Sequence, residues 1–303
     1  MLLTDLNPCE GNTVFMKNFN IGDFIFGNLA RLMAVSVLVI LVSIFYVLFD
    51  HAKLAINTLG FGFIFNTSWA PNVEKFGAFP AIYGTLTSTS IAMIVATPIA
   101  IGIAIFLSEI VRGSIKAFIG MLIELLAAIP SIVYGMWGLF FFVPLIQAVT
   151  HSSGIGTLTA SIILAIMIIP FTAAVSRDAM DTTPDILKES AYALGATKWD
   201  VIKDVVIPFA KVGIIGSIIL SLGRALGETM AVTFVMGNAT RMPSSILEPA
   251  TSIPVILANE FSEADGDLYY SSLFFLALIL FVLSFGVIAV AKFVFLRKVR
   301  KNG

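Results

Sequence analysis

The sequence predicts an all-α integral membrane protein, and its composition is the first observation behind this prediction. Of its 303 residues, 12% are charged and 58% are hydrophobic, and the mean hydropathy is +0.98. A soluble domain carries about 25% charged and about 45–50% apolar residues. The composition therefore excludes an ordinary soluble domain, and the net charge of −1 gives no indication of a nucleic-acid partner.

Long uncharged runs are the second observation. They cover residues 32–49, 81–107, 152–176 and 268–291. A membrane-spanning helix needs about 20 apolar residues, within a range of about 17–25. The strands of an outer-membrane barrel are far shorter, at about 10 residues of alternating character. The runs therefore predict helices that cross a bilayer.

The distribution of Lys and Arg, the third observation, sets the number of crossings. Residues 117–150 hold Glu124 as their one charge and contain Pro130 and Pro144, so they could cross once or twice. Cytoplasmic loops are enriched in Lys and Arg. With one crossing, the only such residues in outer loops are Lys53, Lys75 and Arg241. We therefore expect six transmembrane helices and cytoplasmic termini, with the third helix broken or kinked near Pro130.

These helices define the expected parts of the chain. They are a cytoplasmic segment 1–27, a first transmembrane helix 28–49, a core of five helices over 80–296 that includes a cytoplasmic loop 177–209, and a basic cytoplasmic tail 297–303. An outer loop, 237–267, carries Glu248, Glu260, Glu263, Asp265 and Asp267. That loop either faces another protein or is simply solvated. The single Cys9 excludes an intrachain disulfide and a multi-cysteine metal site.

The cytoplasmic loop 177–209 predicts two short helices that meet at Gly195. Pro184 suits the first position of one helix, which would carry an apolar stripe including Leu194. Thr197, with Asp200 three residues later, approximates the capping box of a second helix, which we expect to end before Pro208. Glycine is a common helix stop. Such a loop would form a rigid body just below the membrane.

The spacing Glu189-Ser190-Ala191, Gly195, Val205 and Ile207-Pro208 resembles the EAA signature of ABC-importer permeases, with departures at Ser190, Val205 and Ile207. The resemblance implies the type I ABC-importer (MetI-like) permease fold. It also implies a coupling helix that docks on a cytoplasmic ATPase, formed by Glu189, Ser190, Ala191, Leu194, Gly195 and Pro208. The alternative is an amphipathic helix on the lipid surface.

The chain contains no GxxxxGK[ST] sequence, so it has no P-loop for ATP. We therefore expect no enzymatic activity and no cofactor in this chain. ATP and Mg²⁺ would be bound by a separate ATPase.

Three charged residues fall inside predicted spans: Glu124, Arg224 and Glu228. A charge at mid-membrane costs about 2.5 kcal/mol or much more, so such residues usually face protein or a water-filled path. On one helix Arg224 and Glu228 would be four residues apart on the same face and could pair. Small residues beside them, Gly216, Gly223 and Gly227, would allow close helix packing. The pair is either a structural lock or the lining of an anion path.

A carboxylate beside an arginine suits an anion that carries its own proton. Phosphate keeps a proton near neutral pH and sulfate does not. Glu228 would then favour protonated phosphate over sulfate.

Residues 123–140, 223–238 and 256–264 resemble the phosphate-specific importer permeases of the PstC type, and together with the EAA loop the resemblance covers most of 80–290. It implies that Arg224 and Glu228 serve phosphate passage. Glu124 is a second lining group, a partner for a charge on another subunit, or protonated. Ser131 and Tyr134, at the break near Pro130, are further candidate path residues because irregular backbone at membrane depth lines cavities or is buried.

The same resemblance implies partners and location. They are a PstA-like permease subunit, two PstB-like ATPase subunits, a PstS-like phosphate-binding protein outside, and a bacterial or archaeal plasma (inner) membrane with its lipid. Alternatives are a permease for another oxyanion such as sulfate or molybdate, an ion-coupled secondary transporter that uses Arg224, Glu228 and Glu124 as a relay, and a non-transporting receptor or scaffold.

Overall fold

A computed structural model describes residues 21–301, and the chain divides into two units at Val47 and Leu48. Most of the predicted segment 1–27 and the last two residues of the predicted tail lie outside the described residues. The described part of the first unit, residues 21–47, belongs to helix α1 (Ile21–Leu59). Within residues 25–47 most side chains are apolar, and the described part of this unit holds no second helix for them to pack against, as expected of a helix surrounded by lipid or by another chain.

Six helical segments of the described chain are long and apolar enough to cross a membrane, which agrees with the predicted number. They are Ile25–Leu59, Phe79–Ile110, Ser131–Thr150, Thr157–Asp181, Lys198–Leu226 and Asp267–Val294.

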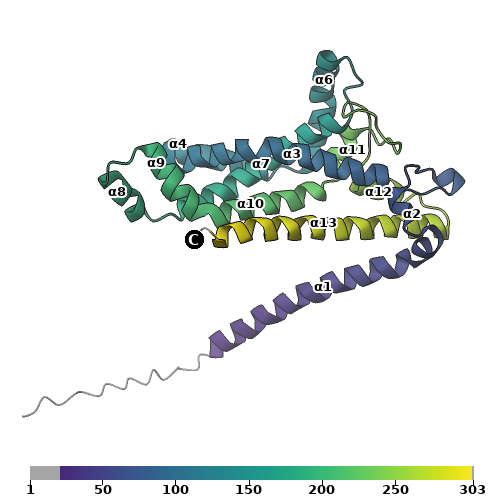
Figure 1. The fold of residues 1–303 in the computed structure, drawn as a ribbon, viewed down its shortest axis with the longest axis horizontal. Helices are drawn as coiled ribbons and strands as arrows, with labels where there is room; N and C mark the ends of the chain where they lie inside the picture. Colours follow the sequence, from purple (N-terminus) through teal and green to yellow (C-terminus); the bar gives the residue numbers. More distant parts are fainter. Residues whose placement is uncertain (1–20, 302–303) are drawn as a thin grey trace, which may run out of the picture. The chain divides into compact units, whose positions relative to one another are not determined.

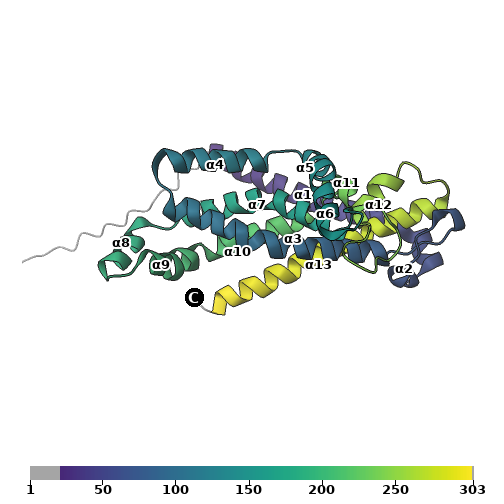
Figure 2. The same ribbon diagram turned by 90° about the horizontal axis from the view of Figure 1, so that it is seen from above.

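The second unit is a bundle in which α3, α7, α10 and α13 run alongside one another (Figures 1 and 2). Its elements, including the π-helical turns η2, η3 and η4, are α2 (Gly62–Phe65), η1 (Pro71–Val73), α3 (Phe79–Ile105), η2 (Phe106–Ile110), α4 (Gly113–Ala127), α5 (Ser131–Trp137), η3 (Gly138–Phe142), α6 (Val143–Thr150), α7 (Thr157–Asp181), α8 (Asp185–Ala193), α9 (Lys198–Val201), η4 (Ile202–Val206), α10 (Ile207–Leu226), α11 (Met230–Met236), α12 (Ile253–Glu260) and α13 (Asp267–Lys301).

Helix α7 is the most buried of these spans, and α3, α4 and α10 pack against it. Along α3 the side chains of Ala92, Ala96, Ala100 and Ala104 recur every four residues and are fully buried. Residues four apart share one face of a helix, and small side chains let two helices approach closely. This row of alanines therefore explains the close packing of α3 within the bundle.

The predicted break in the third helix is present at Pro130. Helix α4 ends at Ala127, Pro130 caps the next segment, and α5 begins at Ser131. Proline lacks the N–H that would continue the hydrogen-bond ladder. Beyond the break the chain leaves the bundle direction, so that α6 turns away from α3 and α7 (Figure 1).

Glu260 joins the segments 50–80 and 237–267, which the sequence analysis predicts to be outer loops. Its Oε2 atom accepts hydrogen bonds from Trp69 Nε1 and Tyr269 Oη, each at 2.7 Å. Stacked aromatic rings surround this contact, including Phe63 on Phe275 with centroids 4.6 Å apart. Glu260 therefore holds the loops together, and it is not available to the acidic outer surface that the sequence suggested.

Candidate functional site

Arg224 lies in the last turn of α10 and is exposed, although its neighbours Ala225 and Leu226 are buried. Its Cζ lies 5.9 Å from the ring centroid of Phe171, a cation–π arrangement. Tyr134 of α5 is close enough to interact electrostatically with the guanidinium. Within the described residues no carboxylate lies within 4.0 Å of Arg224. Its charge is therefore available to a ligand.

The expected pairing of Arg224 with Glu228 on one helix is wrong. Helix α10 ends at Leu226, and Gly227 caps it. Glycine costs about 0.8–1.0 kcal/mol relative to alanine in a helix interior, which makes this position a natural end. Glu228 lies in the link to α11, where its Oε1 accepts the N–H of Ala231 at 3.2 Å. The carboxylate thus satisfies a backbone donor of α11 that has no partner inside the helix.

Glu124 of α4 is paired within the chain. Its Oε1 lies 2.9 Å from Nη2 of Arg177 on α7, and that nitrogen also donates to Asp178 at 2.7 Å. The sequence had assigned Arg177 to the cytoplasmic loop, whereas α7 continues to Asp181. Gly120, one turn before Glu124, lies directly against the Arg177 guanidinium, so a side chain there would displace it.

Two buried hydroxyl pairs set the register of α7 and α10. Thr172 Oγ1 lies 2.6 Å from Ser221 Oγ, and Ser176 Oγ lies 2.7 Å from Ser217 Oγ. The helices are therefore antiparallel. On α7, Arg177 lies just beyond the Ser176–Ser217 pair, and on α10, Arg224 lies just beyond the Thr172–Ser221 pair, at the opposite end of the paired stretch. With a rise of 1.5 Å per residue, the two arginines therefore lie about 12 Å apart along the bundle. The candidate path residues thus occupy two levels, Glu124 with Arg177 and Arg224 with Tyr134.

Tyr134 and Ser131 have different surroundings. Tyr134 Oη donates to the carbonyl of Leu126 at 2.9 Å, which is one of the last carbonyls of α4 and has lost its helical partner at the break. Tyr134 therefore bridges the break while its ring packs against a buried cluster of α3, α7 and α10 residues that includes Ala225. Ser131 opens α5, is half-buried, and makes no hydrogen bond to other described residues through its side chain.

The three glycines predicted to pack helices differ in their surroundings. A side chain at Gly223 would meet Ile288 of α13 at 3.3 Å. Gly216 faces open space as far as the described residues extend, and a side chain at Gly227 would meet only the carbonyl of Gly223, at 3.8 Å. In α10 it is instead Gly213 that lies against α7, because a side chain there would collide with Ala179. Sequence reasoning missed Gly213, although it stands one turn before Gly216 in the same helix.

The loop 177–209, predicted to be cytoplasmic, forms the two predicted helices, α8 and α9. Gly195 adopts the left-handed conformation at φ +88°, and Thr197 and Asp200 form the predicted capping box. Helix α8 begins one residue after Pro184. Its apolar side chains are strongly exposed, with Ile186 at 70% and Leu194 beyond its end at 90%.

The expected end of the second loop helix before Pro208 is wrong. Helix α9 continues through the π-helical turn η4 into α10, and Pro208 stands in the first turn of α10. The N–H of Ile207 bonds to the carbonyl of Ile202, five residues back. The wider π turn accommodates a proline that has no N–H to donate. The loop is therefore mechanically continuous with α10.

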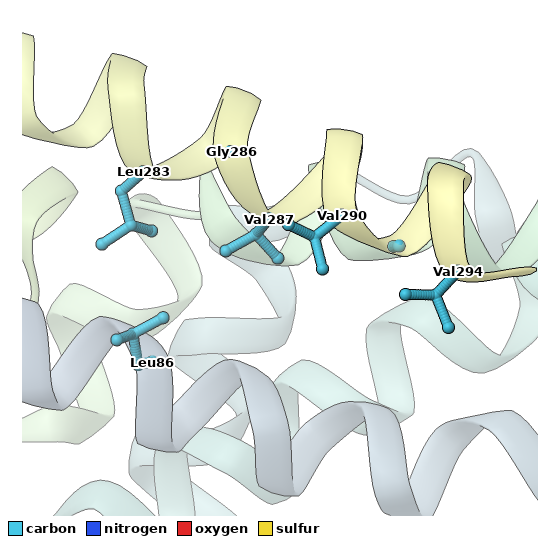
Figure 3. A pocket seen from close by; sticks show the side chains of 7 residues that line it. Leu86, Leu283, Gly286, Val287, Val290 and Val294 are labelled. Atoms are coloured by element: carbon cyan, nitrogen blue, oxygen red, sulfur yellow. The ribbon is translucent and has the colours of Figure 1, made fainter.

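An open apolar groove of about 580 Å³ lies between α3 and α13 (Figure 3). It is lined by Leu86 on one helix and by Leu283, Val287, Val290 and Val294 on the other. Its lining offers almost no polar surface, so it cannot bind an anion and is separate from the candidate site.

Three comparisons with known proteins bear on the site. A protein-family model described as "Binding-protein-dependent transport system inner membrane component" matches residues 96–300. Proteins named phosphate transport system permease protein PstC are 46% identical in Mesorhizobium japonicum (95% of this chain, 94% of that protein) and 45% identical in Pasteurella multocida (94% and 95%). A probable PstC of Methanocaldococcus jannaschii is 33% identical over 87% of this chain and 90% of its own.

Solved structures support the fold. A chain of a bacterial alginate ABC transporter, determined with an alginate pentasaccharide-bound periplasmic protein, superposes with a TM-score of 0.61 at 15% identity, covering 89% of this chain and 95% of that chain. A chain of the inward-facing MetNI methionine ABC transporter gives a TM-score of 0.56 at 18% identity, covering 73% and 94%. At these identities the likeness concerns the fold alone, which is that of ABC-importer permeases.

Proposed function

Since this chain belongs to the family of binding-protein-dependent transport system inner membrane components, we propose that it is a transmembrane permease subunit of an ATP-driven phosphate importer. Near full-length similarity to PstC proteins supports the phosphate assignment. The structural observation that carries it is Arg224, an exposed guanidinium in the last turn of α10 with no carboxylate within 4.0 Å among the described residues.

Arg224 would attract the anion, and its surroundings suit phosphate. A guanidinium donates paired hydrogen bonds that match the geometry of phosphate oxygens. Tyr134 is near enough to interact with it electrostatically, and Glu228 follows in the link after α10. Near neutral pH phosphate keeps a proton that a carboxylate can accept, whereas sulfate has none. Glu228 would therefore favour phosphate and disfavour fully ionised oxyanions.

A second permease subunit would complete the path. Arg224 and Gly227 are exposed, and Gly216 meets no neighbour among the described residues. A helix of a PstA-like subunit fits against such a small-residue face, and the anion would pass between the two subunits. A PstS-like phosphate-binding protein would deliver it from outside.

ATP hydrolysis would take place on separate PstB-like ATPase subunits, two per complex, because this chain has no P-loop. The exposed apolar side chains of α8 and Leu194 would dock on them, with Glu189, Ser190 and Gly195 in the same hairpin. This arrangement places α8 and both termini in the cytoplasm, in agreement with the positive-inside rule.

The hydroxyl pairs between α7 and α10 suggest how movement of α8 reaches Arg224. Helix α8 lies between α7 and α10 in the chain, and the pairs Thr172–Ser221 and Ser176–Ser217 fasten these helices together. Closure of the ATPase dimer would move α8, and α7 and α10 would follow as one body. The path at Arg224 would then open outward, and hydrolysis would reverse the movement.

The test is phosphate uptake by the reconstituted complex with Arg224→Gln, beside its ATPase activity and subunit composition. We expect uptake to fall while assembly and ATP hydrolysis persist. Arg241→Gln, in an outer loop, is the matched control. Failure of Arg224→Gln to assemble would assign the residue to structure, and uptake without ATP or binding protein would favour an ion-coupled transporter.

A further inference from the structure

Helix α8 is connected to α3 by an ion pair. Lys188 Nζ lies 2.7 Å from Glu109 Oε1, and Glu109 belongs to η2, the π-helical continuation of α3. The chain itself joins α8 to α7 on one side and, through α9 and η4, to α10 on the other. No such covalent path leads directly to α3, so the ion pair adds a third attachment.

This pair is more buried than the other ion pairs of the described residues. The side chains of Lys188 and Glu109 are 16% and 8% exposed, whereas every other pair has at least one partner exposed by 37% or more. Removing one partner of a buried pair leaves a charge without compensation, which is strongly unfavourable. Separating the two charges when α8 moves would therefore be costly.

The surroundings allow such movement. A polar cavity of about 270 Å³ lies beside the pair, lined among others by Arg112, Asp185 and Tyr192. Helix α8 has no buried residue of its own. The elements that hold it, η2 and η4, are both π-helical, and π turns within helices are frequent at functional sites. The cavity gives α8 space to shift while the ion pair keeps it attached to α3.

Beyond Glu109, a displacement would pass into the centre of the bundle. Helix α3 carries the row of buried alanines and packs closely along α7. Packed helices move as rigid elements and do not deform continuously. A force on Glu109 would therefore shift α3 together with α7.

We propose that Lys188 and Glu109 form a positioning pair that carries the movement of α8 into α3, so that its loss uncouples ATP hydrolysis from transport. This inference rests on the proposed function. Without the pair, α8 still docks on the ATPase and hydrolysis continues. The η2 end of α3 then follows α8 only indirectly, through the packing of α3 on α7, and fewer cycles open the path.

The experiment uses the complete reconstituted complex and measures anion transported per ATP hydrolysed. The variants are Lys188→Gln, Glu109→Gln and the charge swap Lys188→Glu with Glu109→Lys. Lys116→Gln is the matched control, because it breaks a pair with Asp181 at 3.0 Å that joins α4 to α7 without involving α8. We expect each single variant to lower the ratio at least about fivefold, the lower end of common coupling energies. The swap should restore it.

Several results would overturn the inference. One is an unchanged ratio of anion transported to ATP hydrolysed in single variants that assemble. Another is an equal loss of this ratio in Lys116→Gln. A third is a set of single variants that fail to assemble while the charge swap is fully active, because this would assign the pair to folding. The ratio is measured for whichever anion the wild-type complex transports. A wild-type complex that carries another anion would therefore contradict the phosphate assignment without affecting the test of the pair.

Discussion

Glu228→Gln should reduce the preference of the complex for phosphate over sulfate without unfolding the chain. The Glu228 carboxylate accepts the N–H of Ala231 at 3.2 Å, and the amide oxygen of glutamine can accept the same bond. The substitution therefore removes the negative charge and keeps the connection to α11. A change in anion preference in Glu228→Gln can therefore be attributed to the lost charge and not to a disturbed fold.

The size of the effect follows from hydrogen-bond energies. A bond to a charged group contributes about 1.5–3 kcal/mol, and a neutral bond contributes about 0.5–1.5 kcal/mol. Losing the charge should thus cost about 1–1.5 kcal/mol of phosphate binding, which is roughly five- to tenfold. Glu228→Gln also removes the repulsion between this carboxylate and a fully ionised oxyanion such as sulfate. Both effects lower the preference for phosphate over sulfate, which should fall about tenfold in total.

The assay is uptake of labelled phosphate by reconstituted complex, with increasing sulfate outside as competitor. We expect half-inhibition of Glu228→Gln at about tenfold lower sulfate than of the wild type. Glu263→Gln, an exposed acid in an outer loop, should behave as wild type. Equal inhibition of Glu228→Gln and wild type by sulfate would refute the role given to this carboxylate and limit it to supporting α11.

Three further results are expected. Leu194→Asp should weaken co-purification of the ATPase at least about tenfold, since burying a leucine contributes about 1.5–3 kcal/mol; retention at the wild-type level would place the docking surface elsewhere. A double-mutant cycle of Thr172→Val and Ser221→Ala, followed by thermal unfolding in detergent, should give a coupling of about 0.6 kcal/mol, and zero coupling would contradict the hydroxyl pair. Gly213→Leu should destabilise the isolated subunit by about 1–3 kcal/mol through overpacking, whereas Gly216→Leu should affect only its assembly with other subunits; equal destabilisation would contradict the packing described for α10.

Features governed by local chemistry could be predicted from the sequence. A helix that crosses a hydrocarbon core needs about 20 apolar residues, so the long uncharged runs located four of the six spans. Proline cannot continue a helix ladder, which located the break at Pro130. Glycine tolerates positive φ, which located the turn at Gly195. The capping box of Thr197 and Asp200 needs only two residues three positions apart. Each of these outcomes follows from interactions within a few residues.

Features that depend on tertiary structure could not be predicted. The partner of Glu124 is Arg177, 53 residues away on another helix, and no local pattern pairs them. The continuity of α9 with α10 requires a π turn that sequence periodicity does not reveal. The helix end at Leu226 was missed because GxxxG was interpreted as a packing motif, whereas Gly227 ends the helix.

The exposure of Arg224 favours a chain that works as one subunit of a larger complex. A guanidinium facing lipid costs between about 2.5 and more than 10 kcal/mol, and no carboxylate among the described residues offsets its charge. Total folding stabilities are about 5–15 kcal/mol, so a chain with this face towards lipid would lose much of its stability. A water-filled path between two subunits removes that cost, because the charge is then hydrated or bound to an anion. The residue proposed to bind phosphate would therefore also favour assembly with the proposed second subunit, and the path would then lie at the interface between them.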